Sequence, residues 1–442
     1  MLRSIAILFP SHVKVVEHDF PERAEYREWL IDGRFRNAFR DLRAHDHAAS
    51  PFVWFSKSDA SEAKVEDIDC FLGGHEETLD WCRSFLQPGM NSDSLCAEMV
   101  DDGYTPDHGY EYDLVVIGGG SGGMAAAKEA AHLGAKVACL DFVKPSPHGT
   151  TWGLGGTCVN VGCIPKRLFH DSALLHEAIK ADLSGFGIVA GNSEIENGEI
   201  KVPETNVNWE ILTQHIQDYI HSLNFKYRVR LREKEVTYFN KLAKFIDPHT
   251  IEAIDKKGRS STITSSRFLI ATGGRPAPLD CEGGELAISS DDLFSLQKSP
   301  GKTLCVGASY ISLECAGFLA GLGLDVTVAV RSILLRGFDR ECTNRIDAYM
   351  CDHGVKFRHK VTPSKLEKVE NDQIKVTFSD GSEDIYDTVL VAVGRFADTD
   401  KLGLENVGVV TNPKNKKVKG KFEQSTCPNI YAVGDVLDVR IN

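Results

Sequence analysis

The sequence predicts an α/β protein with two parallel-sheet domains and a smaller α/β module in front of them. The chain has 442 residues, which is enough for two or three domains with separate cores. In residues 112–141 an apolar strand, a glycine turn, an alanine-rich helix and a second strand follow one another, and residues 302–331 repeat this order. The repeated βαβ unit predicts two Rossmann-like domains, each built of three layers (ββα).

Composition favours a soluble globular protein with small-molecule or protein partners. Apolar residues make up 42% of the chain, and the net charge of −13 disfavours a nucleic-acid or anionic-membrane partner. The most apolar window, residues 315–324, is about half as long as a membrane-spanning helix of roughly 20 residues, and we expect no transmembrane segment and no signal peptide. Twelve cysteines, mostly scattered singly, suit a reducing compartment. We therefore expect a cytoplasmic protein, with mitochondria as the alternative.

The first glycine turn has the spacing of a dinucleotide-binding loop. Gly118, Gly120 and Gly123 form GxGxxG directly after a strand, where glycines permit a tight turn and close approach of the backbone to a pyrophosphate. A helix predicted to begin near Ser121 would direct its first amides at the phosphates. Asp141 ends the second strand, where a carboxylate can accept hydrogen bonds from ribose hydroxyls. The alternative is a glycine-rich turn without a ligand.

The second glycine turn differs in the residues that would meet the ribose. Gly307 leads GASYIS, in which Ser309 and Ser312 stand at the second and third glycine positions. At the end of the following strand, Arg331 and then Arg336 occupy the region where the first unit carries an acid. Two guanidinium groups in place of a carboxylate favour a 2′-phosphate, and we expect NADPH here rather than NADH. The alternative is that RSILLR is a solvated basic edge.

Cys158 and Cys163 are close together in GTCVNVGCIP and need a separate explanation. Five residues of regular helix rise about 7.5 Å, more than the roughly 6.8 Å upper limit between Cα atoms joined by a disulfide. A bonded pair therefore excludes an undistorted helix, and Gly162 and Pro165 permit such a departure. The pair alone supplies too few ligands for zinc, so we expect no metal site. A redox-active dithiol is favoured over a static clip, with FAD in the first domain between NADPH and sulfur.

These assignments divide the chain into four segments. Residues 1–108 are predicted to form the N-terminal module, and residues 109–280 the first part of the FAD-binding domain. Residues 281–396 are predicted to form the NADPH-binding domain. The chain then returns to the FAD-binding domain in residues 397–442.

Several long motifs together resemble the pyridine nucleotide-disulfide oxidoreductases. The likeness is strongest to the large, animal-type thioredoxin reductases, including thioredoxin glutathione reductases, and it covers about residues 110–437. The motifs that carry it are WGLGGTCVNVGCIPKRLFH, FLIATGGRP, ISSDDLFSL, GASYISLECAGFLAGLGLDVTVAVRSILLRGFD and NIYAVGDV.

The resemblance implies roles for five residues around the dithiol. Cys163 would lie next to the flavin and form a thiolate–flavin charge-transfer complex, while Cys158 would exchange with the next disulfide. Lys166 would lie near the flavin and pair with Glu314, and Tyr310 would gate the nicotinamide pocket. The residues alone would favour a solvated helix lysine at Lys166 and a core aromatic at Tyr310.

The resemblance also implies the remaining nucleotide contacts. Arg331 and Arg336 would hold the 2′-phosphate of NADPH. The other contacts would come from Thr157, Ala243 through its backbone, Gly273 and Asp435 on the FAD side, and from Gly394 and Arg395 on the NADPH side.

The N-terminal module is expected to be incomplete. Residues 50–82 resemble the second half of a glutaredoxin-like fold, with Pro51 as its cis proline and Gly73 and Gly74 at the later turn. A working glutaredoxin carries a cysteine motif after its first strand, but no cysteine precedes Cys70 in this chain. We expect a truncated or degenerate thioredoxin-like module without dithiol activity of its own.

The predicted function is that of an NADPH-dependent flavoprotein disulfide reductase of thioredoxin reductase type. Electrons would pass from NADPH to FAD, to the Cys158/Cys163 dithiol, and on to a thioredoxin-like or glutathione disulfide. The alternatives are a glutathione reductase and a catalytically incomplete fragment that binds FAD and NADPH. Full-length relatives are expected to be homodimers, and we expect this chain to stop at Asn442 before their dimerisation domain.

Overall fold

The structure is a computed structural model, and it describes residues 53–56, 68–73, 100–189, 194–196, 199–201 and 205–438. The chain divides into two units, residues 1–101 and 102–442. In the first unit the described strands β1 (Val53–Ser56) and β2 (Ile68–Gly73) pair antiparallel. Most of the predicted N-terminal module, including Pro51 and Gly74, lies outside the described residues.

The second unit is built around two sheets, and the first has a parallel centre. Its central strands run in the order β23, β10, β3, β4, β7. Helix α6 (Ser121–His132) makes the crossover between β3 and β4. The bounds of these strands are β3 Tyr112–Ile117, β4 Val137–Leu140, β7 Thr237–Phe239, β10 Ser260–Ile270 and β23 Ile430–Ala432. The short strands β21 (Val418–Lys421), β22 (Gln424–Ser425) and β24 (Leu437–Asp438) extend the sheet beyond β23.

Side chains of alternating direction along β3 build two cores, one on each face of this sheet. Val115 and Ile117 pack against an antiparallel layer formed by β8 (Leu242–Asp247), β9 (Thr250–Ile254) and the first half of β10. Val116 packs on the other face with residues of α6 and of the long helix α10 (Trp209–Glu233). The first domain is therefore a three-layer ββα structure.

The second sheet repeats this plan with parallel strands throughout. Its order is β12, β19, β13, β14, β15, and α12 (Tyr310–Gly321) connects β13 to β14. The bounds of the strands are β12 Ile288–Ser289, β13 Thr303–Val306, β14 Val326–Val330, β15 Lys356–His359 and β19 Thr388–Val391. Helices α12 and α13 (Arg340–Asp352) cover one face. The antiparallel strands β16 (Pro363–Lys368), β17 (Ile374–Phe378) and β18 (Glu383–Tyr386) cover the other.

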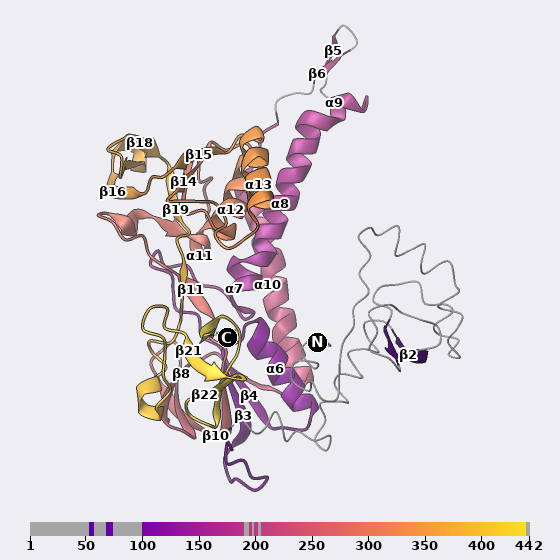
Figure 1. The fold of residues 1–442 in the computed structure, drawn as a ribbon, viewed down its shortest axis with the longest axis vertical. Helices are drawn as coiled ribbons and strands as arrows, with labels where there is room; N and C mark the ends of the chain where they lie inside the picture. The colour runs from indigo at the N-terminus through magenta and orange to yellow at the C-terminus, as the bar shows by residue number, and fades with distance from the viewer. Residues whose placement is uncertain are drawn as a thin grey trace. The chain divides into compact units, whose positions relative to one another are not determined.

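Two kinds of connection join the domains, as Figure 1 shows. The segments that lead from one sheet to the other pair as the ribbon of β11 (Gly274–Pro276) and β20 (Arg395–Ala397). The helices α7 (Gly156–Val161) and α8 (Cys163–Glu177) pack against the second domain, and α10 runs past both domains. Further elements among the described residues are α9 (Leu183–Gly185), α11 (Ser290–Leu293), a π-helical turn (Ala178–Asp182), four short 3-10 helices and the hairpin of β5 (Glu194–Glu196) and β6 (Glu199–Lys201).

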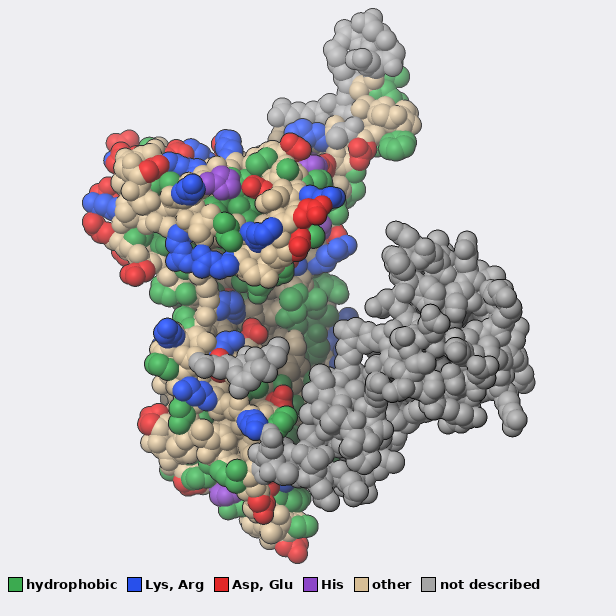
Figure 2. All heavy atoms as spheres, in the orientation of Figure 1, with side chains coloured by type: hydrophobic (Ala, Val, Ile, Leu, Met, Phe, Trp, Pro, Cys, Tyr) green, Lys and Arg blue, Asp and Glu red, His purple; other side chains and the backbone are tan. Residues whose placement is uncertain are grey.

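The predicted α/β fold with two three-layer Rossmann-like domains is confirmed. Over the described part of the face in Figure 2, acidic and basic side chains lie interspersed, so the net charge of −13 is not gathered in one place there. Among the described residues, no helix has the length and apolar character needed to cross a bilayer.

Candidate functional site

The first glycine loop has the conformation that its sequence predicted. Helix α6 begins at Ser121, and the loop before it turns at Gly118 with φ of 118°. A Cβ atom at Gly118 would lie 2.3 Å from the carbonyl oxygen of Ala271, and one at Gly123 would lie 1.9 Å from the oxygen of Gly118. Side chains at these positions would therefore push the strand, loop and helix apart. Gly123 serves this close packing and does not line the cavity beside the loop.

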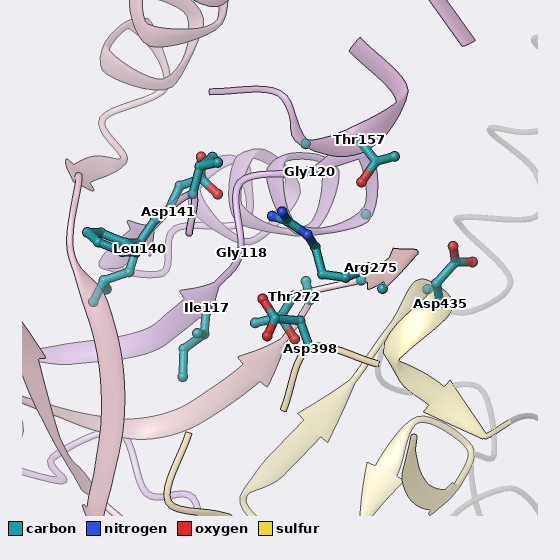
Figure 3. A pocket seen from close by; sticks show the side chains of 18 of the residues that line it. Ile117, Gly118, Gly120, Leu140, Asp141, Thr157, Thr272, Arg275, Asp398 and Asp435 are labelled. Carbon is teal, nitrogen blue, oxygen red and sulfur yellow. The ribbon is translucent and has the colours of Figure 1, made fainter. Parts of the chain in front are cut away.

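A cavity opens beside this loop at the carboxyl ends of β3, β4 and β10. Figure 3 shows Asp141 and Asp435 on opposite sides of the cavity, with Thr272 and Arg275 between them. The predicted residues that line it are Gly118, Gly120, Asp141, Thr157, Cys158, Ala243, Gly273 and Asp435. The structure thus brings together residues that are separated by more than 300 positions in the sequence.

Asp141 places a carboxyl group in the cavity wall. Its Oδ1 accepts a hydrogen bond from the backbone N–H of Gly119 at 2.9 Å. Although the residue is partly exposed to the cavity, burial of the carboxyl group raises its pKa to about 6, and the Gly119 hydrogen bond offsets part of this rise. Since one N–H leaves further lone pairs without a donor, the carboxyl group can accept from a hydroxyl group of a ligand.

The cavity also contains cations that the sequence did not single out. The guanidinium of Arg275 lies over the Trp152 ring, 4.7 Å from its centre, and forms an ion pair with buried Asp291 at 3.0 Å. Lys144 forms an ion pair with Asp398 across the cavity wall. These partners are distant in sequence, so no local pattern could reveal them, although Arg275 follows directly after the FLIATGG stretch.

The second glycine loop reproduces the geometry of the first. Gly307 also has φ of 118°, and its Cβ atom would lie 2.3 Å from the carbonyl oxygen of Ala392. At the third glycine position, Ser312 is fully buried and its Oγ has no hydrogen-bond partner. Tyr310 begins α12 and is 52% exposed, so it is not a core aromatic.

The arginines expected at the second site lie just beyond β14. Arg331 and Arg336 are both exposed, and Arg336 donates a hydrogen bond to the Ser332 hydroxyl at 2.8 Å. Gly394 and Arg395 lie where β19 leads into β20, and Arg395 donates to the carbonyl of Gly274. Arg395 therefore lies on the ribbon that joins the two domains.

The two cysteines lie on either side of a break between helices. Helix α7 ends at Val161 and α8 begins at Cys163, while Gly162 between them has φ of −145° and ψ of −121°. A Cβ atom at Gly162 would lie 2.9 Å from the carbonyl oxygen of Thr157. The segment CVNVGC is therefore not an undistorted helix, as the sequence requires if the pair is to be bonded; both thiols are free in the structure.

The two thiols have different surroundings. Cys158 lines the cavity and is partly buried, and burial together with the neighbouring Cys163 thiol raises the pKa of Cys158 to about 11. Cys163 is exposed at the first position of the 15-residue helix α8. Among the residues that line the cavity, Cys158 is present and Cys163 is not.

Lys166 and Glu314 join the dithiol helix to the second domain. The Lys166 Nζ lies 2.8 Å from Oε1 of Glu314 on α12. The hydrogen bond that Lys166 donates to Glu314 and, to a smaller extent, the charges of Glu314 and Cys163 raise the pKa of Lys166. The lysine is therefore a fixed cation beside Cys163, one turn along α8.

The residues present fit the two nucleotides that the loops predict. The first cavity has a glycine loop that a pyrophosphate can approach closely, and the carboxyl group of Asp141 can accept further hydrogen bonds. The buried Oγ1 of Thr272 has no hydrogen-bond partner. The second loop offers the same glycine turn with two exposed guanidinium groups close by. FAD fits the first set, and a dinucleotide with a 2′-phosphate fits the second.

Two dinucleotide loops and a pair of thiols beside the first of them define a class, the nucleotide-dependent thiol–disulfide oxidoreductases. Comparison with known proteins gives the family. Residues 112–442 match the family described as Pyridine nucleotide-disulphide oxidoreductase, and the chain belongs to that family. This confirms the resemblance read from the motifs.

A relative within the family is named Thioredoxin reductase SEP1, from Emiliania huxleyi. It is 50% identical to this chain over 333 residues, which cover 74% of the chain and 64% of the relative. FAD and NADPH are the cofactors of the thioredoxin reductases in this family. The aligned part spans less than two thirds of the relative's length.

Proposed function

We propose that the chain is an NADPH-dependent flavoprotein disulfide reductase of thioredoxin reductase type. The observation that carries the proposal is the break at Gly162, which places Cys158 in the wall of the first dinucleotide cavity and Cys163 at the start of α8 beside Lys166. A dithiol in this position can receive an electron pair from a nucleotide bound in the cavity.

The chain's own residues would bind and orient the two nucleotides. The backbone amides at the start of α6 would meet the pyrophosphate of FAD, and Asp141 would accept hydrogen bonds from its ribose. Arg331 and Arg336 would hold the 2′-phosphate of NADPH, with Tyr310 exposed at the nicotinamide end of α12. When bound, FAD would link the two reactions, since a flavin can accept a hydride from NADPH and pass two electrons to a disulfide.

The dithiol would then pass its electrons to an external disulfide. The thiolate of one cysteine attacks the incoming disulfide and forms a mixed disulfide, and the second cysteine resolves it, which regenerates the Cys158–Cys163 bond. Lys166 would stabilise the thiolate at Cys163, held in place by Glu314. The family resemblance gives the charge-transfer role to Cys163 and the exchange role to Cys158, whereas in the structure Cys158 lines the cavity and Cys163 is exposed.

We propose a thioredoxin-like protein as the external disulfide. The support is the likeness to a protein named as a thioredoxin reductase, over residues that include both nucleotide loops and the dithiol. Glutathione disulfide is the second candidate, and competition between the two substrates at equal concentration would rank them.

Anaerobic titration of the purified chain with NADPH tests the proposal. The protein should be yellow, and its flavin absorbance should bleach with NADPH and much less with NADH. A colourless preparation that does not respond to NADPH would contradict it. The double variant Cys158→Ser with Cys163→Ser is the matched control, since it should bleach but transfer no electrons to a disulfide.

A further inference from the structure

Two buried asparagines form a hydrogen-bonded pair beneath the dithiol turn. Asn160 lies between the two cysteines in α7 and is 2% exposed, and Asn224 lies on α10 and is 5% exposed. The Nδ2 of Asn224 donates to Oδ1 of Asn160 at 2.9 Å and to the carbonyl of Leu154 at 2.7 Å. Asn160 in turn donates to the carbonyls of Gly153 and Gly156 at 3.1 and 2.8 Å.

Two of these hydrogen bonds, to the carbonyls of Gly153 and Leu154, hold the loop that precedes α7, and the other two join the asparagine pair to α7 and α10. The glycines of this segment are too close to their neighbours to accept side chains: a Cβ at Gly153 would lie 2.4 Å from Asn224 Oδ1. A Cβ at Gly156 would lie 2.7 Å from the Cα of Gly120 in the first glycine loop. The amide pair thus holds the loop against the phosphate-binding turn on one side and against α10 on the other.

Helix α10 gives this pair a rigid base. Its first residue, Trp209, is buried in the core of the second domain, whereas Leu231 near its other end is buried in the core of the first. Asn224 lies on the same buried face as Ile216 and Ile220. A polar group on this face costs free energy unless its hydrogen bonds are made, and here they are made to the dithiol segment.

We propose that Asn160 and Asn224 are positioning residues that hold the Cys158–Cys163 turn and the first glycine loop in one arrangement. The pair keeps the two thiols within bonding reach of each other and next to the cavity. It acts through the backbone of residues 153–161 and touches neither sulfur. This inference rests on the proposed function, because it concerns the ease with which the Cys158–Cys163 disulfide forms and opens.

Loss of the amide pair should therefore change the redox equilibrium of the dithiol. In Asn224→Leu the side chain keeps a similar volume but cannot donate, so the Leu154 carbonyl and the Asn160 amide lose their partner. The turn then samples arrangements in which the thiols are further apart, and formation of the disulfide becomes less favourable. We expect the equilibrium constant for disulfide formation to fall about tenfold, which corresponds to a midpoint potential about 30 mV less negative.

Equilibration of the full chain in glutathione redox buffers measures this directly. After alkylation, mass spectrometry of the peptide that carries Cys158 and Cys163 gives the fraction oxidised, whether or not nucleotides are bound. Ile220→Val is the matched control, because it disturbs packing on the same helix face one turn away and leaves the amide pair intact. It should keep the wild-type potential, and circular dichroism should show all variants folded.

Each outcome bears on a different statement. A wild-type chain that forms no reversible Cys158–Cys163 disulfide would contradict the proposed function. A reversible disulfide whose potential is the same in Asn224→Leu, or shifts equally in Ile220→Val, would overturn the positioning role alone. If Asn224→Leu does not fold, Asn224→Ser replaces it, because serine keeps one donor and should shift the midpoint potential less in the same direction. If neither variant folds, the pair serves folding, and the proposal is contradicted.

Discussion

Asp141 shows how the cavity alters the chemistry of a single residue. Its carboxyl group has a pKa of about 6 in the folded protein, above the ordinary value of 3.8, because it is buried. At a pH between 3.8 and about 6, Asp141 is protonated in the folded state and ionised in the unfolded state. The contribution of Asp141 to stability is therefore favourable at low pH and is lost as the pH rises through about 6.

Asp141→Asn should remove this pH dependence in flavin-free protein. The free energy of unfolding of the wild type should fall relative to that of the variant by roughly 2 to 3 kcal/mol between pH 4 and pH 7, from a shift of about two pKa units. Urea unfolding at a series of pH values measures the difference. Parallel pH profiles for the two proteins would show that the carboxyl group is not perturbed.

Cys158 is predicted to react slowly with alkylating reagents in the reduced protein. Its pKa of about 11 leaves little thiolate at neutral pH, because burial and the Cys163 thiol both disfavour the charged form. The rate of modification by iodoacetamide should rise about tenfold per pH unit from pH 7 to pH 10. Cys163→Ala should lower the pKa but leave it above 9, since burial remains; a flat pH profile would contradict this assignment.

At the scale of elements, the contact between α8 and α12 couples the dithiol helix to the second domain. Besides the Lys166–Glu314 pair, the two helices approach each other at Gly321, where a Cβ atom would lie 2.9 Å from the Cβ of Ala173. His176 adds a hydrogen bond to the Gly321 carbonyl at 2.8 Å. The end of α12 therefore needs a residue without a side chain.

Gly321→Ala should separate these helices and destabilise the chain. We expect a loss of about 1 to 3 kcal/mol from overpacking, which exceeds the gain of less than about 1 kcal/mol from helix propensity. Gly317→Ala on the same helix is the control, because its Cβ would meet only the end of Met350 at 4.0 Å. Denaturant unfolding should rank the control at or above the wild type, and an equal loss in both would contradict the contact.

The end of β14 is predicted to determine the choice of nucleotide. Replacing Arg331 and Arg336 together by Ala should weaken NADPH binding by tenfold or more, because a charge-assisted hydrogen bond is worth about 1.5 to 3 kcal/mol. NADH binding should change little. The control is Arg345→Ala, which removes an exposed arginine on α13 that is paired with Glu341. If the double variant kept the preference for NADPH over NADH, Arg331 and Arg336 would not bind the 2′-phosphate.

At the scale of the whole molecule, the sequence predicts those structural features that a short stretch of residues determines. Gly118 and Gly307 each have φ of 118° at the turn between a strand and the next helix, and this local requirement for glycine lets the sequence indicate both dinucleotide loops. The departure from a helix at Gly162 could likewise be expected for a bonded pair, because five residues of regular helix would hold the two cysteines too far apart.

Contacts between distant segments could not be predicted in this way. Lys144 meets Asp398, and Arg267 meets Asp102, across more than 160 residues of sequence. Asn160 and Asn224 carry no pattern of their own, because an asparagine in a helix gives no sign of which carbonyls it will meet. Such residues become visible only when the strands and helices have been packed.

The transfer of electrons from NADPH to Cys158 and Cys163 through this chain is the central claim, and counting thiols tests it most directly. The oxidised protein is treated anaerobically with NADPH, alkylated, and analysed by mass spectrometry of the peptide that contains both cysteines. We predict that two alkyl groups appear on this peptide with NADPH, and that NADH gives far fewer. A protein that holds FAD and consumes NADPH but leaves this peptide oxidised would contradict the claim.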